Sequence, residues 1–513
     1  MKFASFLASQ ARTQGNKEAL VCGEQRMTFS ELDRQSSQVA VALHGMGVRP
    51  GDRVGLYLPN RPEFLVALLG IVKAGAITVP INMRLAQPEI RFMLEDATPS
   101  VLFLGSEHIA AFEELAQGLA PIRRVVLGTA GAADTSYAAI MEGPAGPLPD
   151  VPPEVDECMI SYTSGTTGKP KGAILTQANY IIMNGYLNAL YWGFNSADRI
   201  LITTPLAHRT AFARLCNMLV LGATLVILPK FDAAEVARII DAEQITVLGI
   251  VPTVGKMLMP AIQEAPERFA SLRRILATGE AFPVSLKEAL QAYLPQVQLY
   301  SFYSSTEVGV VTLLGPDHQI SHAASVGRVL PGIETRLVGE QGQEVATGEV
   351  GEIWVRTGEP GRYLTLKSYY NRPEANAESL VNGWFATGDM ARVDEDGFVY
   401  IVDRKKDMIL SGGYNIYSKE VESALNEHPA VENSAVIGVP DELFGEAVAA
   451  FVILQQDASV SEKELTDWCV QRIASYKKPK YFRFVESLPY NSTGKVMKRE
   501  LLASFSPQPT TIR

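Results

Sequence analysis

Short runs of β-forming residues alternate with helical stretches through the first 320 residues of this 513-residue chain. The clearest runs are RVGLYL at 53–58, ITVPIN at 77–82, SVLFLG at 100–105, TLVIL at 224–228, TVLGIV at 246–251 and RRILATG at 273–279. Strands separated by helices favour parallel or mixed sheets with helices packed on their faces. We therefore expect an α/β fold with two such layers, because a single hydrophobic core rarely organises so long a chain.

Three further stretches give local predictions. Residues 28–45 open with Thr28 and Glu31 in a capping-box pattern and continue with apolar residues at helical spacing, which predicts an amphipathic helix. The apolar run 64–81 contains Lys73 and two glycines, so we expect a buried helix that passes into a strand, not a membrane span. The Ala/Gly/Pro-rich stretch 128–153 is expected to be a surface connection.

The texture of the chain changes near residue 325, where short strands with Gly-rich turns replace the alternating pattern. This predicts a small β-barrel-like subdomain over about 326–403, after α/β subdomains over about 1–325. Beyond DRKKD at 403–407 the pattern reads helix, strand, strand, helix and a basic tail. We expect a large N-terminal domain of residues 1–403 and a small α+β C-terminal domain of residues 404–513.

Charge and cysteine content exclude several classes of protein. The formal net charge of -10 argues against a chain that coats itself with nucleic acid. Four cysteines lie far apart without a CxxC pair, which disfavours a zinc ribbon or a disulfide framework. The N-terminal residues are too polar for a secretory signal. We expect a cytoplasmic protein of ordinary composition, 47% hydrophobic and 20% charged, with no transmembrane segment.

The decapeptide TSGTTGKPKG at 163–172 concentrates hydroxyls, glycines and lysines. Glycines let the backbone approach a ligand, hydroxyls add donors and lysines add positive charge, a combination that suits a polyphosphate. The Walker A pattern GxxxxGK[ST] is not met, because the spacing is too short and Pro170 stands where Ser or Thr is required. The sequence thus predicts a phosphate loop of a different kind, with a plain polar surface loop as the alternative.

The longer stretch SYTSGTTGKPKGAILTQANY resembles the signature of the adenylate-forming superfamily, which includes acyl-CoA synthetases, nonribosomal adenylation domains and luciferases. The other motifs of that family occur in the family's order, before and after this stretch, along nearly the whole chain. They are KAGAITVPIN at 73–82, PLAH at 205–208, YSSTE at 303–307, GWFATGD at 383–389, DRKKDMILSGGYNIYSKEVE at 403–422 and NSTGK at 491–495.

The resemblance implies an ATP-dependent acid–CoA ligase that acts on a fatty or aromatic acid. A carboxylate attacks the α-phosphorus of ATP to form an acyl adenylate and pyrophosphate, and the thiol of CoA then attacks the acyl carbon. Such chemistry needs positioning and neutralisation of charge more than covalent help. ATP, Mg²⁺ and CoA are the implied cofactor and co-substrates.

The same resemblance assigns the nucleotide site residue by residue. Tyr303 is expected on the adenine face, Thr306 at the α-phosphate and Glu307 at Mg²⁺. Asp389 is expected to bind the ribose with help from Arg404. The residues implied at the β- and γ-phosphates are Thr163, Ser164, Gly165, Thr166, Thr167, Gly168 and Lys171.

Lys495 is implied to be the central catalytic residue, because its ammonium can touch carboxylate and phosphate at once when two anions must meet. Thr163, Glu307 and His208 complete the implied catalytic set. The family's C-terminal domain is mobile, and its hinge maps to 404–406 with Lys406 as the pivot. Gly412 and Gly413 would let pantetheine pass close to the backbone.

The implied acyl pocket includes His208, Val254, Gly279, Phe302 and Ser304. Gln177 stands where the family more often has His, and we expect little effect on catalysis. Ser304 stands where the family more often has Gly, so we expect a slightly narrower and more polar pocket floor. Three charged residues near the pocket have an open role at this point. Glu280 could face the ligand or make a structural hydrogen bond. Arg209 and Arg214 could bind a second anionic group of the acid, or they could point to solvent or to the phosphates.

The acceptor and the acid also stay open. A carrier protein could replace CoA, and the acid could be short, dicarboxylic or amino-bearing. The basic cluster Lys477, Lys478 and Lys480 could meet CoA phosphates, a carrier or only solvent. His318 and His322 have helical spacing but lack the other residues of a metal motif. Partners are expected to be small molecules, with no nucleic acid, and the sequence is compatible with a homodimer.

Overall fold

The computed structural model describes residues 2–163, 170–279, 282–358, 365–490 and 495–505. The chain divides into two compact units. The first contains Met1–Thr335, Val355–Ala386 and Gly397–Val399, and the second contains Arg336–Trp354, Thr387–Asp396 and Tyr400–Arg513. The predicted mixed α/β architecture, with a large N-terminal part and a small C-terminal part, is confirmed.

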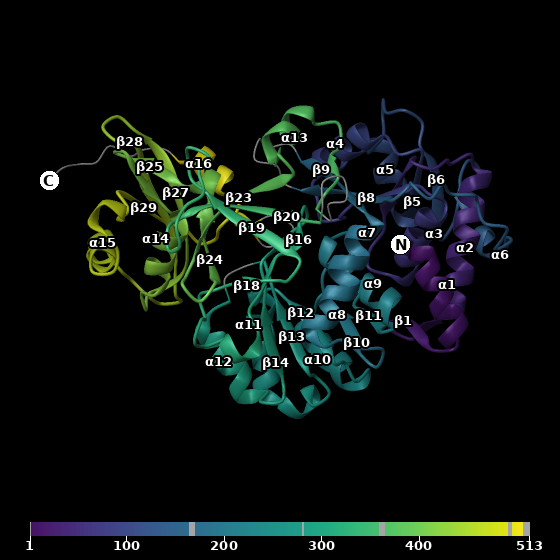
Figure 1. Cartoon of the computed structure of the whole chain (residues 1–513), viewed down its shortest axis with the longest axis horizontal. Coiled ribbons are helices and arrows are strands. Elements are labelled where there is room, and N and C mark those ends of the chain that lie inside the picture. The colour runs from purple at the N-terminus through teal and green to yellow at the C-terminus, as the bar shows by residue number, and fades with distance from the viewer. Residues whose placement is uncertain (1, 164–169, 280–281, 359–364, 491–494, 506–513) are drawn as a thin grey trace. The chain divides into compact units, whose positions relative to one another are not determined.

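One sheet of the first unit has the strand order β21-β9-β8-β4-β3-β5-β6-β7 (Figure 1). Neighbouring strands from β8 to β7 are parallel, whereas β9 pairs antiparallel with both β8 and β21. The strands of this sheet are β3 (Arg53–Tyr57), β4 (Ile77–Pro80), β5 (Val101–Gly105), β6 (Arg123–Leu127), β7 (Thr135–Ser136), β8 (Glu157–Thr163), β9 (Lys171–Thr176) and β21 (Ser368–Tyr369).

The other large sheet of this unit has the order β14-β13-β12-β10-β11-β1-β2. All neighbours are parallel except the hairpin partners β1 and β2. Its strands are β1 (Glu18–Cys22), β2 (Gln25–Thr28), β10 (Arg199–Ile202), β11 (Thr224–Ile227), β12 (Val247–Ile250), β13 (Arg274–Ala277) and β14 (Gln298–Ser301). Two sheets therefore supply the two expected layers, and the N-terminal hairpin joins the sheet formed mainly by residues after 199.

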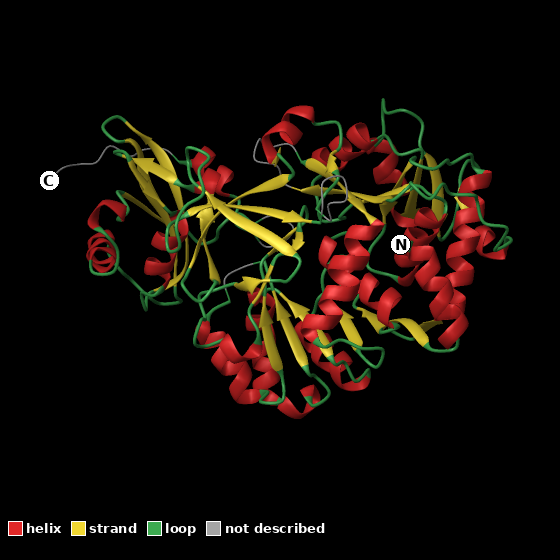
Figure 2. Cartoon of the chain, in the orientation of Figure 1, coloured by secondary structure: helices red, strands yellow, loops and turns green. Residues whose placement is uncertain are grey.

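Figure 2 shows the helices gathered around the strands of these two sheets. The helical segments of the first unit that matter below or build its layers are α1 (Phe3–Gln14), α2 (Phe29–Gly45), α3 (Pro62–Lys73), α4 (Gln87–Ala97), α5 (Ile109–Leu115), α6 (Tyr137–Glu142), α7 (Gln177–Tyr180), the π-helical turn η2 (Ile181–Tyr186), α8 (Leu187–Trp192), α9 (Arg209–Leu221), α10 (Ala233–Ala242), α11 (Pro252–Glu264), α12 (Val284–Tyr293) and α13 (Pro373–Ser379).

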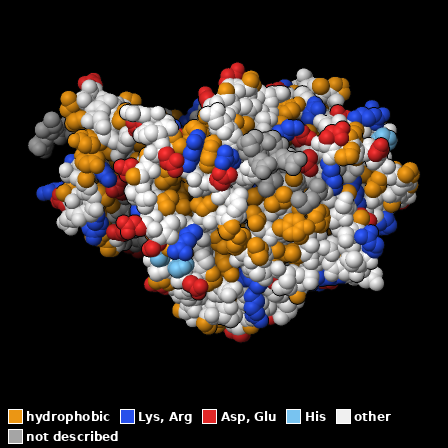
Figure 3. Space-filling model, viewed as in Figure 1, with side chains coloured by type: hydrophobic (Ala, Val, Ile, Leu, Met, Phe, Trp, Pro, Cys, Tyr) orange, Lys and Arg blue, Asp and Glu red, His pale blue; other side chains and the backbone are white. Residues whose placement is uncertain are grey.

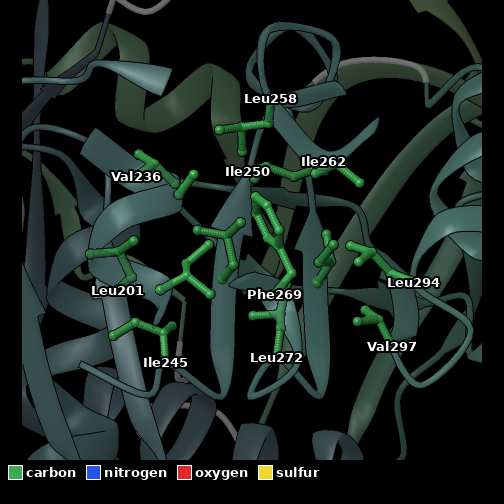
Figure 4. Close-up of a cluster of buried hydrophobic side chains, with 14 of the residues drawn as sticks. Leu201, Val236, Ile245, Ile250, Leu258, Ile262, Phe269, Leu272, Leu294 and Val297 are labelled. Carbon is green, nitrogen blue, oxygen red and sulfur yellow. The ribbon is translucent and has the colours of Figure 1, made fainter. Parts of the chain in front are cut away.

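The second of these sheets carries a large apolar core, shown in Figure 4. Leu201 and Ile250 on the strands, Leu258 and Ile262 on α11, and Phe269 belong to this cluster, with Phe269 in its middle in Figure 4. Burial of apolar surface at about 25 cal/mol per Å² makes such a cluster the main source of stability for the layer. The rigid edge of this sheet then fixes the segment that follows β14.

Two local predictions are confirmed and one is wrong. Thr28 and Glu31 form the predicted capping box at the start of α2, and the run 64–81 forms buried α3 followed by β4. The stretch 128–153 is not only a surface connection, because it contains β7 and α6. Tyr137 is buried there, and the amide of Gln38 on α2 donates to two carbonyl groups at the end of α6. The composition of the stretch does not predict the burial of Tyr137 or the hydrogen bonds from Gln38.

Further strands carry the chain from the first unit into the second. They are β15 (Ser304–Ser305), β16 (Gly309–Val310), β17 (Thr312–Leu313), β18 (Gly327–Val329), β19 (Ile333–Val338), β20 (Gly351–Thr357), β22 (Leu380–Val381), β23 (Trp384–Val393) and β24 (Phe398–Arg404). The imidazole of His322 stacks on the ring of Phe398, with ring centroids 3.7 Å apart, and the imidazole of His318 contacts the same ring edge-on at 5.1 Å. These histidines therefore pack at the start of β24.

The C-terminal part of the second unit has the predicted order of helix, strand, strand, helix in α14, β27, β28 and α15. Its elements are β25 (Ile409–Ser411), β26 (Tyr414–Ile416), α14 (Ser418–Asn426), β27 (Val431–Asp441), β28 (Gly445–Leu454), α15 (Glu462–Val470), β29 (Tyr481–Phe484) and α16 (Lys498–Ser504). The domain bounds proposed from the sequence stay a prediction. Within the described ranges, every helix is too short or too polar to cross a membrane.

The burial of Lys287 on α12 can be tested through the pH dependence of stability, because its ammonium group titrates. Its side chain is fully buried, and its ammonium donates to the carbonyl oxygens of Gln319 (3.2 Å) and Ala323 (2.9 Å). Burial lowers the pKa of Lys287 to about 8 from an ordinary value of 10.5. Between these two pKa values the unfolded chain binds more protons than the folded chain. The free energy of unfolding therefore increases as the pH rises through this range.

We predict that raising the pH from 7.5 to 9.5 increases the melting temperature of the wild type relative to Lys287→Met, because methionine has no proton to lose. Differential scanning calorimetry at both pH values measures the difference. The exposed Lys230→Met is the matched control and should follow the wild type. A difference between wild type and Lys287→Met that does not change with pH would contradict the assignment.

Candidate active site

The ends of the decapeptide 163–172 belong to the antiparallel hairpin of β8 and β9. Thr163 pairs with Lys171, and Tyr162 pairs with Gly172. A Cβ on Gly172 would lie 2.6 Å from a methyl carbon of Ile160, so the strands pack too closely there for a side chain. The predicted phosphate contacts Ser164, Gly165, Thr166, Thr167 and Gly168 lie outside the described residues.

Glu307 meets Thr163 at the end of this hairpin, although 144 residues separate them in sequence. The distance from Thr163 Oγ1 to Glu307 Oε1 is 3.3 Å. The backbone of Glu307 is fixed on both sides, since its N–H donates to Ser305 Oγ (3.2 Å) and its carbonyl accepts from the N–H of Leu366 (2.6 Å). The structure therefore joins the decapeptide 163–172 and the motif YSSTE at 303–307 at one carboxylate.

Tyr369 on β21 completes this arrangement. Its hydroxyl donates to the same Oε1 of Glu307 at 3.0 Å, and the ammonium of Lys171 lies 5.3 Å from the centre of its ring. Burial, with the neighbouring Glu307 carboxylate, raises the pKa of Tyr369, so the phenol stays protonated and remains a donor. Tyr369 lies in none of the sequence motifs and was therefore not predicted, since it is the pairing of β21 with β9 that brings it here.

Arg209 fixes the segment that contains Tyr303 and Thr306. Its guanidinium is buried, and it donates to the carbonyl oxygen of Thr306 and to Asn179 Oδ1 (3.0 Å). The guanidinium also lies 4.9 Å from the ring centre of Tyr180. In this structure Arg209 therefore supports the backbone of a predicted nucleotide-binding segment.

Tyr303 is held through its main chain. Its carbonyl accepts from the N–H of Val311 at 2.9 Å, and its N–H donates to Thr312 Oγ1 at 3.3 Å. Its side chain is partly buried. These bonds define the direction of the strand-like segment that carries both Tyr303 and Thr306.

The predicted acyl-pocket residues Gly279, Phe302 and Ser304 are brought together by Thr278. The Thr278 hydroxyl donates to the carbonyl of Phe302 at 3.1 Å and lies 3.4 Å from Ser304 Oγ. Gly279, next to it, has a φ of +91°, which strongly favours glycine. Glu280 lies outside the described residues.

Two other predicted pocket residues, Val254 and His208, lie in α11 and at the start of α9. Val254 on α11 is half-buried against the core of the second sheet. His208 is the N-cap residue of α9, where its Nδ1 accepts from the N–H of Thr210 at 3.4 Å. Gln177, at a position where the family more often has His, accepts from the N–H of Phe3 at 2.8 Å and so anchors the N-terminal helix.

In the second unit, the predicted ribose residues Asp389 and Arg404 form an ion pair of 3.2 Å. The carboxylate is almost fully buried, and the N–H of Asp389 donates to Thr387 Oγ1 at 3.1 Å. Beside it, Glu352 accepts from the N–H of Gly388 (3.0 Å) and pairs with Lys405 (2.9 Å). This turn therefore presents an oriented carboxylate next to a guanidinium.

The predicted hinge residue Lys406 lies in the short turn η5 (Lys405–Asp407) and is exposed. The preceding Asp403 is buried, and its carboxylate accepts from the hydroxyl of Ser418 at 2.8 Å. The turn between β25 and β26 contains Gly412 and Gly413, with φ values of +59° and +82°. The predicted catalytic Lys495 is exposed and belongs to the same unit.

Two lysines of the basic cluster are already paired with carboxylates. Lys477 lies 2.6 Å from Glu420, and Lys480 pairs with Asp441. Lys478 donates to the carbonyl of Ser475 at 3.0 Å. The cluster is therefore less basic than its sequence suggests.

The donors at Glu307 fit Mg²⁺, a hard cation that takes oxygen ligands and is usually held by one or two carboxylates together with phosphates. One carboxylate and two hydroxyls, from Thr163 and Tyr369, meet at this point. Within the described ranges, no group of three or more His, Cys, Asp or Glu side chains could hold a metal without other ligands. This is the arrangement expected where substrate phosphates supply the remaining ligands.

Comparison with known proteins identifies the class. Residues 7–370 match the family of AMP-binding enzymes, and residues 420–495 match the C-terminal domain of these enzymes. The chain belongs to this adenylate-forming family, as its motifs predicted.

Three relatives illustrate the range of the family. A feruloyl-CoA synthase from Amycolatopsis sp is 36% identical over 505 residues, which cover 98% of both chains. The fatty acid–[acyl-carrier-protein] ligase ScoC of Streptomyces coeruleorubidus is 32% identical, covering 96% of this chain and 95% of its own. The o-succinylbenzoate CoA synthetase of Bacillus subtilis, solved with an acyl-adenylate intermediate, is 31% identical, with a TM-score of 0.84 over 98% of both chains.

We predict that Tyr369→Phe weakens binding of Mg²⁺–ATP by about 2- to 10-fold, the usual contribution of one net hydrogen bond. The variant removes only the hydroxyl that donates to Glu307. Isothermal titration calorimetry measures the change. Tyr370→Phe is the matched control, because the side chain of Tyr370 packs in the apolar cluster of the first sheet. Equal affinities for the two variants would contradict a role of Tyr369 in orienting Glu307.

Proposed function

We propose that this protein is an ATP-dependent acid–CoA ligase that forms an acyl adenylate and passes the acyl group to CoA. The observation that carries the proposal is the contact between Thr163 and Glu307, which joins the end of the phosphate-loop hairpin to a carboxylate suited to Mg²⁺. The relatives named above, two of which are CoA ligases, support the choice of reaction.

In the first step, a carboxylate oxygen of the acid attacks the α-phosphorus of ATP and the bond to pyrophosphate breaks. Tyr303 and Thr306 would hold the adenine and the α-phosphate on the segment that Arg209 fixes. Asp389 would accept from the ribose hydroxyls, with its orientation set by Arg404. Mg²⁺ bound at Glu307 would neutralise phosphate charge during this attack.

Lys171 and Lys495 would supply the remaining positive charge. Lys171, at the base of the hairpin, would face the β- and γ-phosphates together with the hydroxyls of the decapeptide. Lys495 would bridge the acid's carboxylate and the α-phosphate, two anions that otherwise repel each other. Because the attack brings these charges together, the effect of Lys495 is expected mainly in the rate of adenylation.

In the second step, the thiolate of CoA attacks the acyl carbon and AMP leaves. The C-terminal part of the chain would rotate at Lys406 between the two steps, withdrawing Lys495 and presenting the turn at Gly412 and Gly413. The positive φ values of both glycines suit a turn that lets pantetheine pass close to the backbone. His208, at the N-cap of α9, would stand at the acyl carboxylate as a polar gate.

A carrier protein is the second candidate acceptor. The relative ScoC is named as a ligase that uses an acyl-carrier protein, and this supports the alternative. The pairing of Lys477 and Lys480 with carboxylates weakens the case for a basic docking surface for an acidic carrier. CoA is therefore the preferred acceptor.

We also propose a cytoplasmic location, supported by four cysteines that are all free in the structure. A homodimer and an acid that is short, dicarboxylic or amino-bearing are compatible with the same sequence. An apolar pocket does not predict the chain length of the acid, because one methylene group changes the binding free energy that separates two acids by only about 1–3 kcal/mol.

The experiment that tests the function is a pyrophosphate-release screen with acetate, medium and long fatty acids, benzoates, cinnamates and dicarboxylates. Each active acid is then assayed for acyl-hydroxamate and for acyl-CoA. Formation of both supports the proposal, and hydroxamate without acyl-CoA would favour the carrier protein. Release of pyrophosphate by none of the acids would contradict acid activation.

We predict that Lys495→Ala lowers the rate of adenylation from acid and ATP by at least about 100-fold, the scale of losing one charge-stabilising group at a transition state. Thioester formation from supplied acyl adenylate and CoA should keep most of its rate. Single-turnover assays of each half-reaction measure both effects. Equal losses in the two half-reactions would contradict the assigned role.

Lys406→Pro is expected to show the opposite pattern. Proline fixes φ and removes the backbone N–H at the predicted pivot, so rotation between the two steps is restricted. Adenylation should stay within a few-fold of wild type while thioester formation falls at least about 10-fold. Lys406→Ala, which keeps the freedom of the backbone, is the control. A comparable loss in adenylation would show that the pivot lies elsewhere.

A further inference from the structure

The helix formed by η2 and α8 buries two asparagines among its apolar residues and leaves two large apolar side chains exposed. Tyr186 and Leu190 are 48% and 70% exposed, whereas Asn184 and Asn188 are 2% and 1% exposed. Hydrophobic side chains gather over the α8 region in the view of Figure 3. A helix normally buries its apolar face, so a buried polar face needs its own explanation.

The buried face of this helix packs against α9. Asn217 on α9 donates from Nδ2 to the carbonyl oxygen of Asn184 at 2.7 Å, and the guanidinium of Arg214 lies 5.0 Å from the ring centre of Trp192. The two helices run side by side in Figure 1. We call these buried side chains the polar seam; its members are Asn184, Asn188, Trp192, Arg214 and Asn217.

Several polar atoms of the seam have no hydrogen-bond partner within the described part of the chain. Three are donors, on Arg214 (Nη1), Trp192 (Nε1) and Asn188 (Nδ2). Three are acceptors that also lack a hydrogen-bond partner there, namely Asn184 Oδ1, Asn188 Oδ1 and Asn217 Oδ1. Buried polar groups are almost always hydrogen-bonded, so such a concentration indicates a place where a polar ligand or water completes the bonding.

Arg214 favours an anion over a neutral ligand. Its side chain is 6% exposed, and no carboxylate among the described residues pairs with it. Burial lowers the pKa of Arg214 to about 10, which shows how poorly its charge is solvated. An unpaired buried charge is costly, and a carboxylate is the natural partner of a guanidinium. Arg274 gives the contrast. Both guanidiniums lie over the ring of Phe194, at 5.6 Å for Arg214 and 5.8 Å for Arg274, but Arg274 pairs with Asp198 at 3.2 Å.

The seam adjoins the predicted acyl pocket through Trp192. Its ring centre lies 5.1 Å from that of Phe302, the residue before Tyr303. On the same helix, Met183 faces Gly309 on β16, two residues after Glu307. The buried face of η2 and α8 thus extends from the predicted nucleotide segment toward Arg214.

We propose that the polar seam binds the distal carboxylate of a dicarboxylic acid whose other carboxylate is adenylated. This inference rests on the proposed function and adds the class of acid. The distal carboxylate would accept from Arg214 Nη1, Trp192 Nε1 and Asn188 Nδ2, and water would serve the seam's acceptors. A site that provides hydrogen bonds to one end of a substrate strongly rejects an analogue that lacks that end.

The test compares matched acids that differ only in a distal carboxylate, as straight chains of several lengths and as phenylalkanoic acids. At the preferred length, the wild type should release pyrophosphate with a kcat/KM at least about 10-fold higher for the dicarboxylate. Arg214→Met should lower kcat/KM for that dicarboxylate by about 10- to 100-fold and change the monocarboxylate little. Trp192→Phe, which keeps the ring and removes one donor, should give a smaller loss of the same kind.

Controls separate specificity from stability. Arg274→Met leaves the carboxylate of Asp198 buried without its ion-pair partner, so it should lower the melting temperature. It should also lower kcat/KM for the monocarboxylic and the dicarboxylic acid of each matched pair by the same factor. Arg214→Met should leave the melting temperature unchanged or raise it. A wild type that prefers the monocarboxylate at every length, or an Arg214→Met that affects both members equally, overturns the inference while acid activation stands. Pyrophosphate release with none of the acids would overturn the proposed function itself.

Discussion

The hydrogen-bonding position of Glu307 is the constraint on which the rest of the site depends. Its carboxylate oxygen contacts Thr163 at the end of one hairpin and Tyr369 on the strand that pairs with that hairpin. Its main chain is fixed by Ser305 and Leu366. One side chain therefore connects three distant parts of the sequence, and a cation and phosphates bound there would meet a surface whose geometry is already set.

The support for this carboxylate comes from the two sheets. The hairpin of β8 and β9 belongs to the first sheet, while the segment with Tyr303 and Glu307 follows β14 at the edge of the second. Arg209, from the helix after His208, ties that segment to Asn179 by hydrogen bonds. The large apolar core of the second sheet gives these polar contacts a rigid base.

Much of this arrangement could be predicted from the sequence because the signals are local. Thr28 and Glu31 predict the start of a helix, and the apolar run 64–81 predicts a buried helix followed by a strand. The motifs predicted Thr163 and Glu307 at the phosphates and Mg²⁺ of one nucleotide site, and Arg404 as a partner of Asp389, and both pairs are in contact. Tyr369 could not be found this way, since its role arises from pairing between strands far apart in sequence. Arg209 and Arg214 are five residues apart on one helix, yet one supports a backbone and the other lies in a polar seam, a difference that no local pattern encodes.

The central claim is that an acid's carboxylate attacks the α-phosphorus of ATP in the site built around Glu307. Its most direct test uses an active acid whose carboxylate carries heavy oxygen, with mass spectrometry of the nucleotide product after complete turnover with CoA. The account predicts one labelled oxygen in AMP and none in pyrophosphate, because the attacking oxygen stays with the phosphorus when the thiol displaces AMP. Label in inorganic phosphate or pyrophosphate, with ADP as the product or with unlabelled AMP, would contradict it.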